Sequence, residues 1–234
     1  MFSKKIDIGI LGAMDAEVEA LISKLRRKKV KTVSGIKFYV GMLEGKRVAI
    51  AKCGIGKVFA ALAAEAMIIK FSPSLLVNTG VGGALASGIS VCDVVVADKL
   101  VQHDMDTSPL GDPKGLVSGI NVIYFETDKH AVDTVKQACS DLDINYHVGT
   151  IASGDVFVST SAQKSAIKAE FDASVCEMEG AAIAHVAYVN RTPCCVIRAV
   201  SDSADEGSSM DYMQFLPIAA ANSTKITLAL CKNY

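Results

Sequence analysis

The sequence has no excess of charge of either sign. Its 234 residues include 24 Lys and Arg against 25 Asp and Glu, a formal net charge of −1 at pH 7, and 50% are hydrophobic. These proportions exclude a disordered chain and an acidic or basic interaction tail. Nucleic-acid binding as the main role requires a basic face. The one dense basic run, residues 26–29, is as well explained by the solvated end of a helix.

The sequence also lacks a long hydrophobic run. The longest apolar stretch, residues 58–69, has only 12 residues and contains Glu65, whereas a membrane-spanning helix needs roughly 20. Near the N-terminus, Asp7 and Asp15 interrupt any signal-peptide core. We therefore expect no membrane segment and no export signal, which favours a cytoplasmic protein.

Cysteine and histidine spacings give no sign of disulfides or of a metal site. The seven cysteines are an odd number, lie mostly inside apolar runs and include no Cys-x-x-Cys, which is typical of small buried side chains in a reducing cytosol. Among the four histidines, only His103, beside Asp104 and Asp106, suggests a ligand set. No Gly-x-Ser-x-Gly motif supports acyl chemistry. We expect no metal and no cofactor.

Apolar runs of strand length alternate with segments of helical period. The predicted strands are residues 6–11, 36–43, 47–52, 74–78, 91–97, 147–152, 173–177 and 194–201. The predicted helices are residues 15–25, 57–70, 128–142, 161–171, 180–189 and 211–231. Residues 44–46 suggest a hairpin turn, and the glycine-rich residues 79–88 suggest a loop. This alternation predicts a single α/β domain, residues 1–234, with three α/β/α layers and a mixed central sheet.

In such an architecture the site lies at the loops beyond the carboxyl ends of the strands. Five segments occupy that position: residues 12–17, 78–83, 153–158, 177–180 and 198–202. Carboxylates dominate this rim, which contains a single arginine. A phosphate or another polyanion is therefore a poor match for the site.

Each acid on the rim has both a structural and a functional interpretation. Glu17 falls in the first turn of a helix, where the helix dipole favours an ionised carboxylate. Asp202 ends an apolar strand and is either a cap residue or an acid oriented by Ser201. Glu179 precedes a small-residue helix, and Glu177 is its rival for any functional role.

Three apolar residues on the rim also have both a structural and a functional interpretation. Phe157 and Met178 are ordinary core candidates by residue type. Val81 stands in the glycine-rich segment and has no hydroxyl, so that only backbone N–H groups can donate there.

Taken together, the motifs resemble those of bacterial 5′-methylthioadenosine/S-adenosylhomocysteine nucleosidases, in the nucleoside phosphorylase superfamily. The resemblance runs in family order through essentially the whole chain. It is carried by residues 8–17 (IGILGAMDAE), 53–57 (CGIGK), 78–80 (NTG), 153–155 (SGD), 177–179 (EME) and 198–205 (RAVSDSAD). It implies the nucleoside phosphorylase/hydrolase-like fold and a homodimer, with residues 103–113 near the neighbouring active site.

The resemblance implies hydrolysis of an N-glycosidic bond, with water as co-substrate and release of adenine and a 5′-substituted ribose. Asp202 would protonate adenine at N7, and Glu17 would act as the base on the attacking water, helped by Arg198. The further substrate-binding residues would be Met14, Ile55, Val81, Gly82, Phe157, Val158, Glu177, Met178, Glu179 and Ser201. Among these, Glu179 would bind the ribose hydroxyls and Phe157 would stack on the base.

The chemistry of the bond supports this division of roles. Breaking a ribosyl C–N bond builds positive charge on the sugar and negative charge on the base, so one carboxylate must be charged and another protonated. In inverting glycosidases the acid and the base stand roughly 6.5–9.5 Å apart, and we expect a similar separation. A phosphorylase of the same superfamily and a non-catalytic adenine-nucleoside binding protein are the alternatives.

The preference among nucleosides is left open. Residues 103–111 differ from relatives that place aromatic residues there, and Val81 lacks a hydroxyl that many relatives have. Methylthioadenosine, adenosylhomocysteine, 5′-deoxyadenosine and aminodeoxyfutalosine are all candidate substrates. We expect neither nucleic acid nor membrane as a partner.

Overall fold

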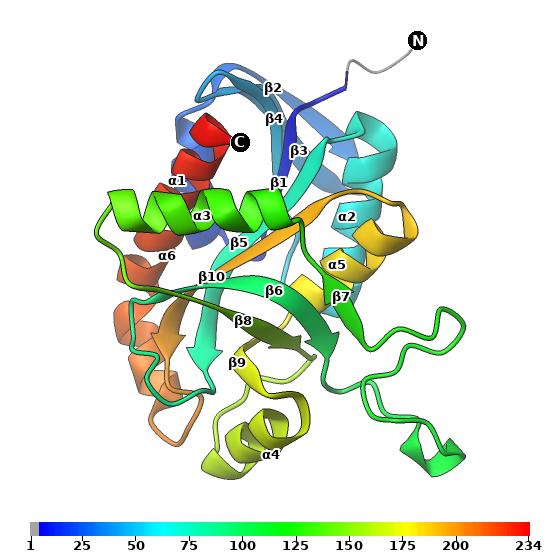
Figure 1. The fold of residues 1–234 in the computed structure, drawn as a ribbon. Helices are drawn as coiled ribbons and strands as arrows, with labels where there is room; N and C mark the ends of the chain where they lie inside the picture. Colours follow the sequence, from blue (N-terminus) through cyan, green and yellow to red (C-terminus); the bar gives the residue numbers. More distant parts are fainter. Residues whose placement is uncertain (1–4) are drawn as a thin grey trace.

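A computed structural model describes residues 5–234 and contains one large sheet flanked by helices (Figure 1). The strands are β1 Ile8–Gly12, β2 Arg26–Val33, β3 Ile36–Leu43, β4 Lys46–Lys52, β5 Leu75–Ala84, β6 Val94–Gln102, β7 Tyr124–Glu126, β8 Tyr146–Ser153, β9 Ala173–Glu177 and β10 Cys194–Asp202. The helices are α1 Asp15–Ser23, α2 Lys57–Phe71, α3 Lys129–Asp141, α4 Ser161–Phe171, α5 Gly180–Val189, α6 Ser208–Asn233 and the short 3₁₀ helix η1 Ser108–Leu110.

The sheet is mixed, as the sequence predicts. Strand β1 pairs in parallel with β4 and β5, and β5 pairs in parallel with β10. Antiparallel pairing extends beyond the predicted β3–β4 hairpin to β2–β3, β5–β9, β6–β7 and β6–β10. Because β5 pairs with both β9 and β10, the five strands β5, β10, β6, β8 and β9 close into a ring.

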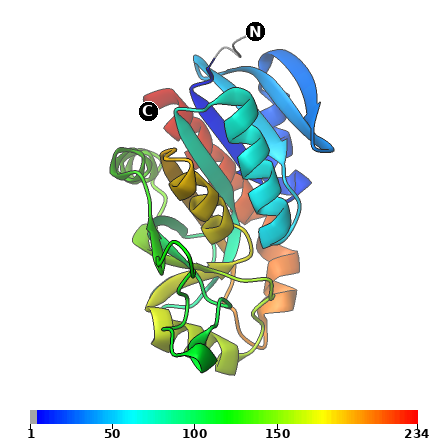
Figure 2. The same ribbon diagram turned by 90° about the vertical axis from the view of Figure 1, so that its right-hand side faces the viewer.

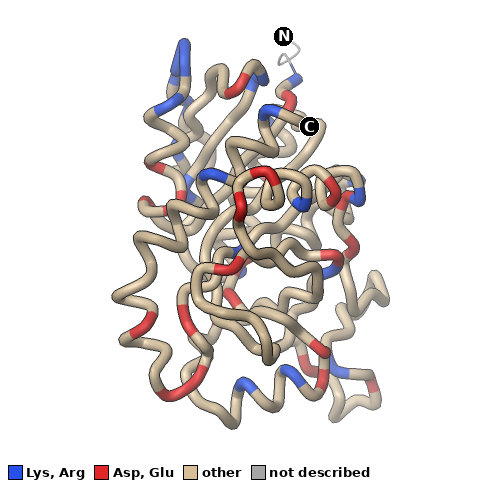
Figure 3. The backbone as a smooth tube through the Cα atoms, turned by 60° about the vertical axis from the view of Figure 1, so that its left-hand side comes forward, with Lys and Arg blue, Asp and Glu red and all other residues tan. Residues whose placement is uncertain are grey.

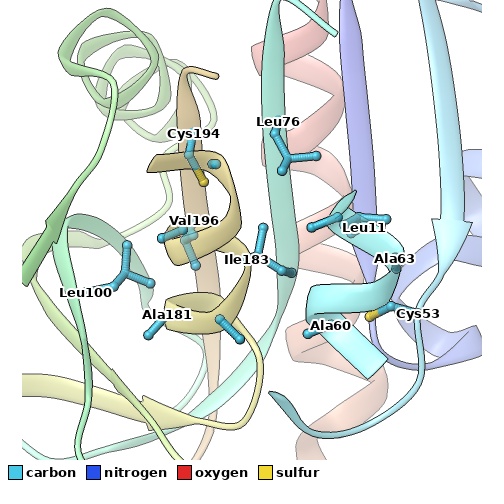
Figure 4. Packing of buried hydrophobic residues seen from close by; sticks show 14 of the residues in the cluster. Leu11, Cys53, Ala60, Ala63, Leu76, Leu100, Ala181, Ile183, Cys194 and Val196 are labelled. Carbon is cyan, nitrogen blue, oxygen red and sulfur yellow. The ribbon is translucent and has the colours of Figure 1, made fainter. Parts of the chain in front are cut away.

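Helices cover both faces of the sheet, which confirms the three-layer prediction. Helices α2 and α5 lie side by side on one face (Figure 2), and α1, α3 and α6 pack together on the other. Small side chains let both helices approach the strands closely: Ala60 and Ala63 of α2 lie near Leu11, and Ala181 of α5 lies near Leu100 and Val196 (Figure 4). The two apolar layers hold the carboxyl ends of the strands in fixed positions.

The glycine-rich segment is not the loop that the sequence suggests. Strand β5 continues through it to Ala84, and all of its residues are buried. A Cβ on Gly80 would lie 2.5 Å from Glu17 Oε1, and one on Gly82 would lie 2.6 Å from Val175 Cγ1. The glycines therefore permit close approach between a buried strand and its neighbours, rather than a flexible turn.

The basic run 26–29 is also misassigned, since it begins strand β2 rather than ending a helix. Helix α1 ends at Ser23, and β2 pairs with β3 at the edge of the sheet. Lys and Arg colour a continuous stretch of the backbone there (Figure 3). Exposed cations on an edge strand discourage pairing with another chain. This accounts for the basic run, and no bound anion or nucleic acid is needed to explain it.

Two short elements between β6 and α3, the strand β7 and the helix η1, have no counterpart in the sequence prediction. Within residues 5–234, none of the helices is both long enough and apolar enough to cross a bilayer.

Candidate active site

A cavity of about 360 Å³ opens where the strand ends of β1, β4, β5, β8, β9 and β10 converge. Its lining is Ala13, Met14, Glu17, Ile55, Val81, Gly82, Gly83, Val156, Phe157, Val158, Cys176, Glu177, Met178, Glu179, Ser201, Asp202 and Tyr212. All of the predicted site residues except Arg198 are in this set. Both candidate catalytic acids, Glu17 and Asp202, therefore face the same cavity.

Glu17 reaches the cavity from the first turn of α1. Its Oε2 accepts hydrogen bonds from the backbone N–H groups of Ala13 at 2.7 Å and Met14 at 3.0 Å, and its Oε1 accepts from Val81 at 3.1 Å. The carboxylate caps its own helix and also faces the cavity. The stabilising role at the helix start is therefore compatible with a functional role in the cavity. Burial raises the pKa of Glu17, while Arg198 and the three N–H groups oppose that rise.

Asp202 is the last residue of β10, where a bulge interrupts the pairing with β5. Ser201 Oγ donates to Asp202 Oδ2 at 2.8 Å, and the Ala204 N–H donates to Oδ1 at 2.9 Å. A Cβ on Gly83 would lie 2.7 Å from Asp202 Oδ1, so only glycine fits beneath this acid. Burial raises the pKa of Asp202 against these two hydrogen bonds, and the nearby Asp211 reinforces the rise. This environment makes the protonated carboxyl more accessible than it is for an exposed Asp.

The carboxylate of Glu177 is hydrogen-bonded to other groups of the protein. Ser153 Oγ and the Arg198 guanidinium both bond to it, and the N–H groups of Glu179 and Gly180 donate to it at the start of α5. Both of its oxygens therefore have protein partners, although the side chain borders the cavity.

Glu179 has fewer hydrogen-bond partners within the protein than Glu177, so its carboxylate is more available to a ligand. Its Oε1 accepts from the Gly56 N–H at 2.8 Å, and its Oε2 lies 3.9 Å from the Arg198 guanidinium. Burial and the adjacent Glu177 raise the pKa of Glu179 to about 7. The carboxylate keeps acceptor positions open toward the cavity, as ligand hydroxyls require.

Arg198 is the predicted site residue that does not border the cavity. Its guanidinium is buried behind the acids and donates to Asn78 and Glu177 as well as to the Ile197 carbonyl. Burial opposes its charge, but Glu177, Glu179 and Glu17 together raise the pKa of Arg198. Arg198 therefore acts through these carboxylates, because it has no surface in the cavity.

One wall of the cavity is aromatic. Phe157 is 45% exposed, so the core interpretation of this residue is wrong. Its ring meets the edge of Tyr212, with centroids 5.7 Å apart and planes at 83°. Met178 is half-buried and lines the cavity between the two glutamates that flank it in sequence.

Sequence reasoning missed several lining residues, chiefly Tyr212. Ala13, Gly83 and Val156 lie inside the rim segments that the sequence singles out, and Cys176 immediately precedes one. Tyr212 comes from the first turns of α6, whose position across the cavity depends on tertiary packing. No local motif marks it.

The arrangement suits a neutral ligand on which positive charge develops. Four carboxylates line the cavity, whereas its lining contains neither Lys nor Arg among the residues that the structure describes. Over the same described part of the chain, groups of three or more His, Cys, Asp or Glu arranged to hold a metal ion are absent. The candidate site is thus an apolar and aromatic pocket with convergent acids.

Comparison with known proteins agrees with this description. The sequence matches the phosphorylase superfamily over residues 7–232. It is 37% identical to a 5′-methylthioadenosine/S-adenosylhomocysteine nucleosidase from Oceanobacillus iheyensis, over 96% of this chain and 98% of that protein.

Solved structures are similar over almost the whole chain. The nucleosidase of the same name from Neisseria meningitidis, in complex with methylthio-immucillin-A, has a TM-score of 0.94 at 36% identity, covering 97% of this chain and 99% of that one. Futalosine hydrolase from Helicobacter pylori has a TM-score of 0.93 at 34% identity, covering 97% and 98%.

Proposed function

The chain belongs to the phosphorylase superfamily, in the family of 5′-methylthioadenosine/S-adenosylhomocysteine nucleosidases, and we propose that it hydrolyses the N-glycosidic bond of these two nucleosides. The products are adenine and the 5′-substituted ribose, and 5′-deoxyadenosine is a further substrate. The observation that carries the proposal is that Glu17 and Asp202 line one cavity, with the positive charge of Arg198 acting on Glu17 and the negative charge of Asp211 acting on Asp202.

Asp202 is the general acid of the proposed reaction. As the C–N bond breaks, electrons pass to the adenine, and a proton delivered to N7 neutralises them. The raised pKa of Asp202 supports this role because it makes the protonated carboxyl easier to form than in an exposed Asp. Ser201 fixes the direction of that carboxyl through the bond to Oδ2.

Glu17 is the base that activates the attacking water. Three backbone N–H groups stabilise its ionised form, and Arg198 adds a buried positive charge behind it. We expect the Glu17 and Asp202 carboxyls to stand roughly 6.5–9.5 Å apart, with the anomeric carbon between them.

The remaining predicted residues hold the nucleoside. Glu179 accepts the ribose hydroxyls, and Met178 packs beneath the sugar. Phe157 stacks on the adenine, and the Val158 backbone bonds to the edge of the base. Ile55, Val81 and Gly82 complete the walls, while Glu177 positions Glu179 and Arg198 rather than binding substrate directly.

Two alternatives are less well supported. A phosphorylase would bring phosphate into a cavity lined by acids. At about 5 Å and an effective dielectric constant of 20, one like-charge pair costs on the order of 3 kcal/mol, enough to weaken phosphate binding more than a hundredfold. A protein that only binds adenine nucleosides would use Phe157 but has no need of both Glu17 and Asp202.

The decisive experiment mixes the protein with 5′-methylthioadenosine and follows free adenine by chromatography. We expect adenine release that is independent of added phosphate. Unchanged nucleoside at high protein concentration contradicts the proposal. Release that requires phosphate identifies a phosphorylase instead.

The finer proposals concern assembly and location. Exposed apolar side chains on α2 and α5 support a homodimer; they are Val58, Phe59, Leu62, Ile69, Tyr188 and Val189. Between β6 and β7 the chain extends away from the body (Figure 1), and Leu110 there is 84% exposed. This supports placing residues 103–113 near the neighbouring active site. Sedimentation equilibrium tests the dimer, since a mass of 24.6 kDa rather than twice that value contradicts it.

We place the enzyme in the cytoplasm, in methionine salvage, as a single nucleosidase domain that acts without a cofactor. The seven cysteines, all of them free thiols, support a reducing compartment. A functional fusion with a fluorescent protein tests the location directly.

A further inference from the structure

The hydroxyl of Tyr212 has an unusual acceptor. It donates to the thioether of Met14, with Oη and Sδ 3.1 Å apart. A thioether is one of the weakest hydrogen-bond acceptors in proteins. Burial raises the pKa of Tyr212, and the charges of Glu17, Asp202 and Glu179 add to that rise. The phenol therefore stays a donor at neutral pH.

The position of the Tyr212 ring is set from two sides. The ring makes a T-shaped contact with Phe157, and the Tyr212 backbone is fixed in the first turns of α6. Met14, by contrast, is half-buried and has a flexible side chain that can turn away. A ligand that displaces the Met14 thioether leaves the Tyr212 hydroxyl needing a new acceptor.

The placement of the nucleoside indicates what that acceptor is. In the proposed function the adenine lies between Phe157 and Asp202, and the ribose hydroxyls lie at Glu179. Met14 is next to the sugar end, because its backbone N–H donates to Glu17. The carboxylates are assigned to the base, the water and the ribose hydroxyls. The 5′ substituent therefore lies against the apolar part of the cavity, where Met14 and Tyr212 meet.

We propose that the Tyr212 hydroxyl selects nucleosides that have a sulfur atom at the 5′ position, by moving its hydrogen bond from the Met14 thioether to the thioether of the substrate. The inference rests on the proposed function and names its specificity-determining residue. The exchange replaces one thioether acceptor with another, so it costs little. A nucleoside with a methylene group in place of the sulfur displaces Met14 but offers the Tyr212 hydroxyl no acceptor, which is unfavourable at this half-buried position.

The test compares 5′-methylthioadenosine with the analogue of the same length in which a methylene group replaces the sulfur. The ratio of the two kcat/KM values is measured for the wild type and for Tyr212→Phe, which keeps the ring and its contact with Phe157. We expect the preference for the thioether to be about 3- to 10-fold larger in the wild type, the range of one neutral hydrogen bond. An equal ratio in the two proteins overturns the inference.

A second variant separates the two sulfur-contacting residues. Met14→Leu removes the acceptor inside the protein but leaves the Tyr212 hydroxyl, so the preference for the thioether substrate persists. If Met14→Leu abolishes that preference, Met14 rather than Tyr212 selects the sulfur, and the inference is wrong.

Failure of the inference differs from failure of the proposed function. Adenine release from both nucleosides, with the same ratio in Tyr212→Phe, removes the inference alone. If the wild type releases adenine from neither nucleoside, the proposed function fails. In that case, the ratio of the calorimetric dissociation constants of the two nucleosides, compared between the wild type and Tyr212→Phe, tests the inference without catalysis.

Discussion

The Glu179 carboxylate accepts a hydrogen bond of 2.8 Å from the backbone N–H of Gly56, which lies 123 residues earlier in the chain. This bond ties the acid proposed to hold the ribose to the turn before α2. The turn is itself fixed by Asp155, which accepts from the Lys57 N–H at 2.8 Å. The position of the Glu179 carboxylate therefore depends on three segments that are distant in sequence, and on the conformation of one glycine.

Gly56→Ala should damage substrate binding more than it damages the fold. Gly56 has a φ of +96°, and a Cβ there would lie 2.9 Å from Asp155 Oδ1. We expect KM to rise about tenfold, because Glu179 loses its orienting donor, with a stability loss of about 1–2 kcal/mol. Gly45→Ala is the control: φ is +83°, but nothing lies within 4 Å of the added Cβ. Gly45→Ala should be destabilised with an unchanged KM, and a parallel rise in KM would contradict the assignment.

Asp202→Asn should bind substrate but turn it over at least about 100-fold more slowly, because the amide has no proton to give to N7. Single-turnover kinetics and a calorimetric dissociation constant separate the two effects. Asp133→Asn, at an exposed residue of α3, serves as the control and should match the wild type. Near wild-type turnover in Asp202→Asn would remove Asp202 from the acid role.

The activity should follow a bell-shaped pH profile. Loss at low pH reflects protonation of Glu17, and loss at high pH reflects deprotonation of Asp202; burial raises the pKa of both groups above 4.5 and 3.8 respectively. Ser201→Ala removes a hydrogen bond that lowers the pKa of Asp202, so the high-pH limb of kcat/KM should move to higher pH. A stationary limb in that variant would show that another group controls it.

The stability should also depend on pH through Glu179. The pKa of Glu179 is about 7 in the folded protein, against an ordinary value of 4.5, because of burial and the adjacent Glu177. Between these values the folded state retains a proton that the unfolded chain has lost. The free energy of unfolding should therefore fall by about 3 kcal/mol as pH rises from about 4.5 to 7, and then level off.

Urea denaturation between pH 5 and pH 8 measures this dependence. Glu179→Gln should reduce this dependence, and the buried Glu17 and Asp202 should account for what is left, because their pKa values are also raised. Glu126→Gln, at an exposed residue of β7, should leave it as in the wild type. An unchanged slope in Glu179→Gln would assign the pH dependence to another group.

Several parts of the site could be predicted because they depend on local sequence. The strands that end at Gly12 and Asp202 are apolar runs with clear limits, and parallel pairing of both with β5 brings their ends to one edge of the sheet. The strand that ends at Glu177 joins them through antiparallel pairing with β5. The acids that follow these strands therefore meet in one place. By contrast, composition alone does not distinguish Glu177 from Glu179, since the hydrogen bonds that occupy Glu177 come from other strands.

Other features depend on contacts between distant segments. Strand β5 runs through its glycines because Glu17 and Val175 press against them, and a glycine-rich segment is locally indistinguishable from a loop. Tyr212 enters the cavity because α6 packs across β5 and β10. The residues that flank Tyr212 in the sequence give no sign of that position.

Phe157→Leu should raise KM while leaving the fold intact. Stacking of a base on an aromatic ring contributes about 1–3 kcal/mol, so loss of the ring should weaken nucleoside binding about tenfold or more. Because Phe157 is 45% exposed and its ring contacts Tyr212 edge-on, the variant should unfold within a few degrees of the wild type. Steady-state kinetics with 5′-methylthioadenosine and a thermal melt measure both effects. An unchanged KM would mean that the adenine lies elsewhere in the cavity, and a large loss of stability would mean that Phe157 has the core role that its exposure argues against.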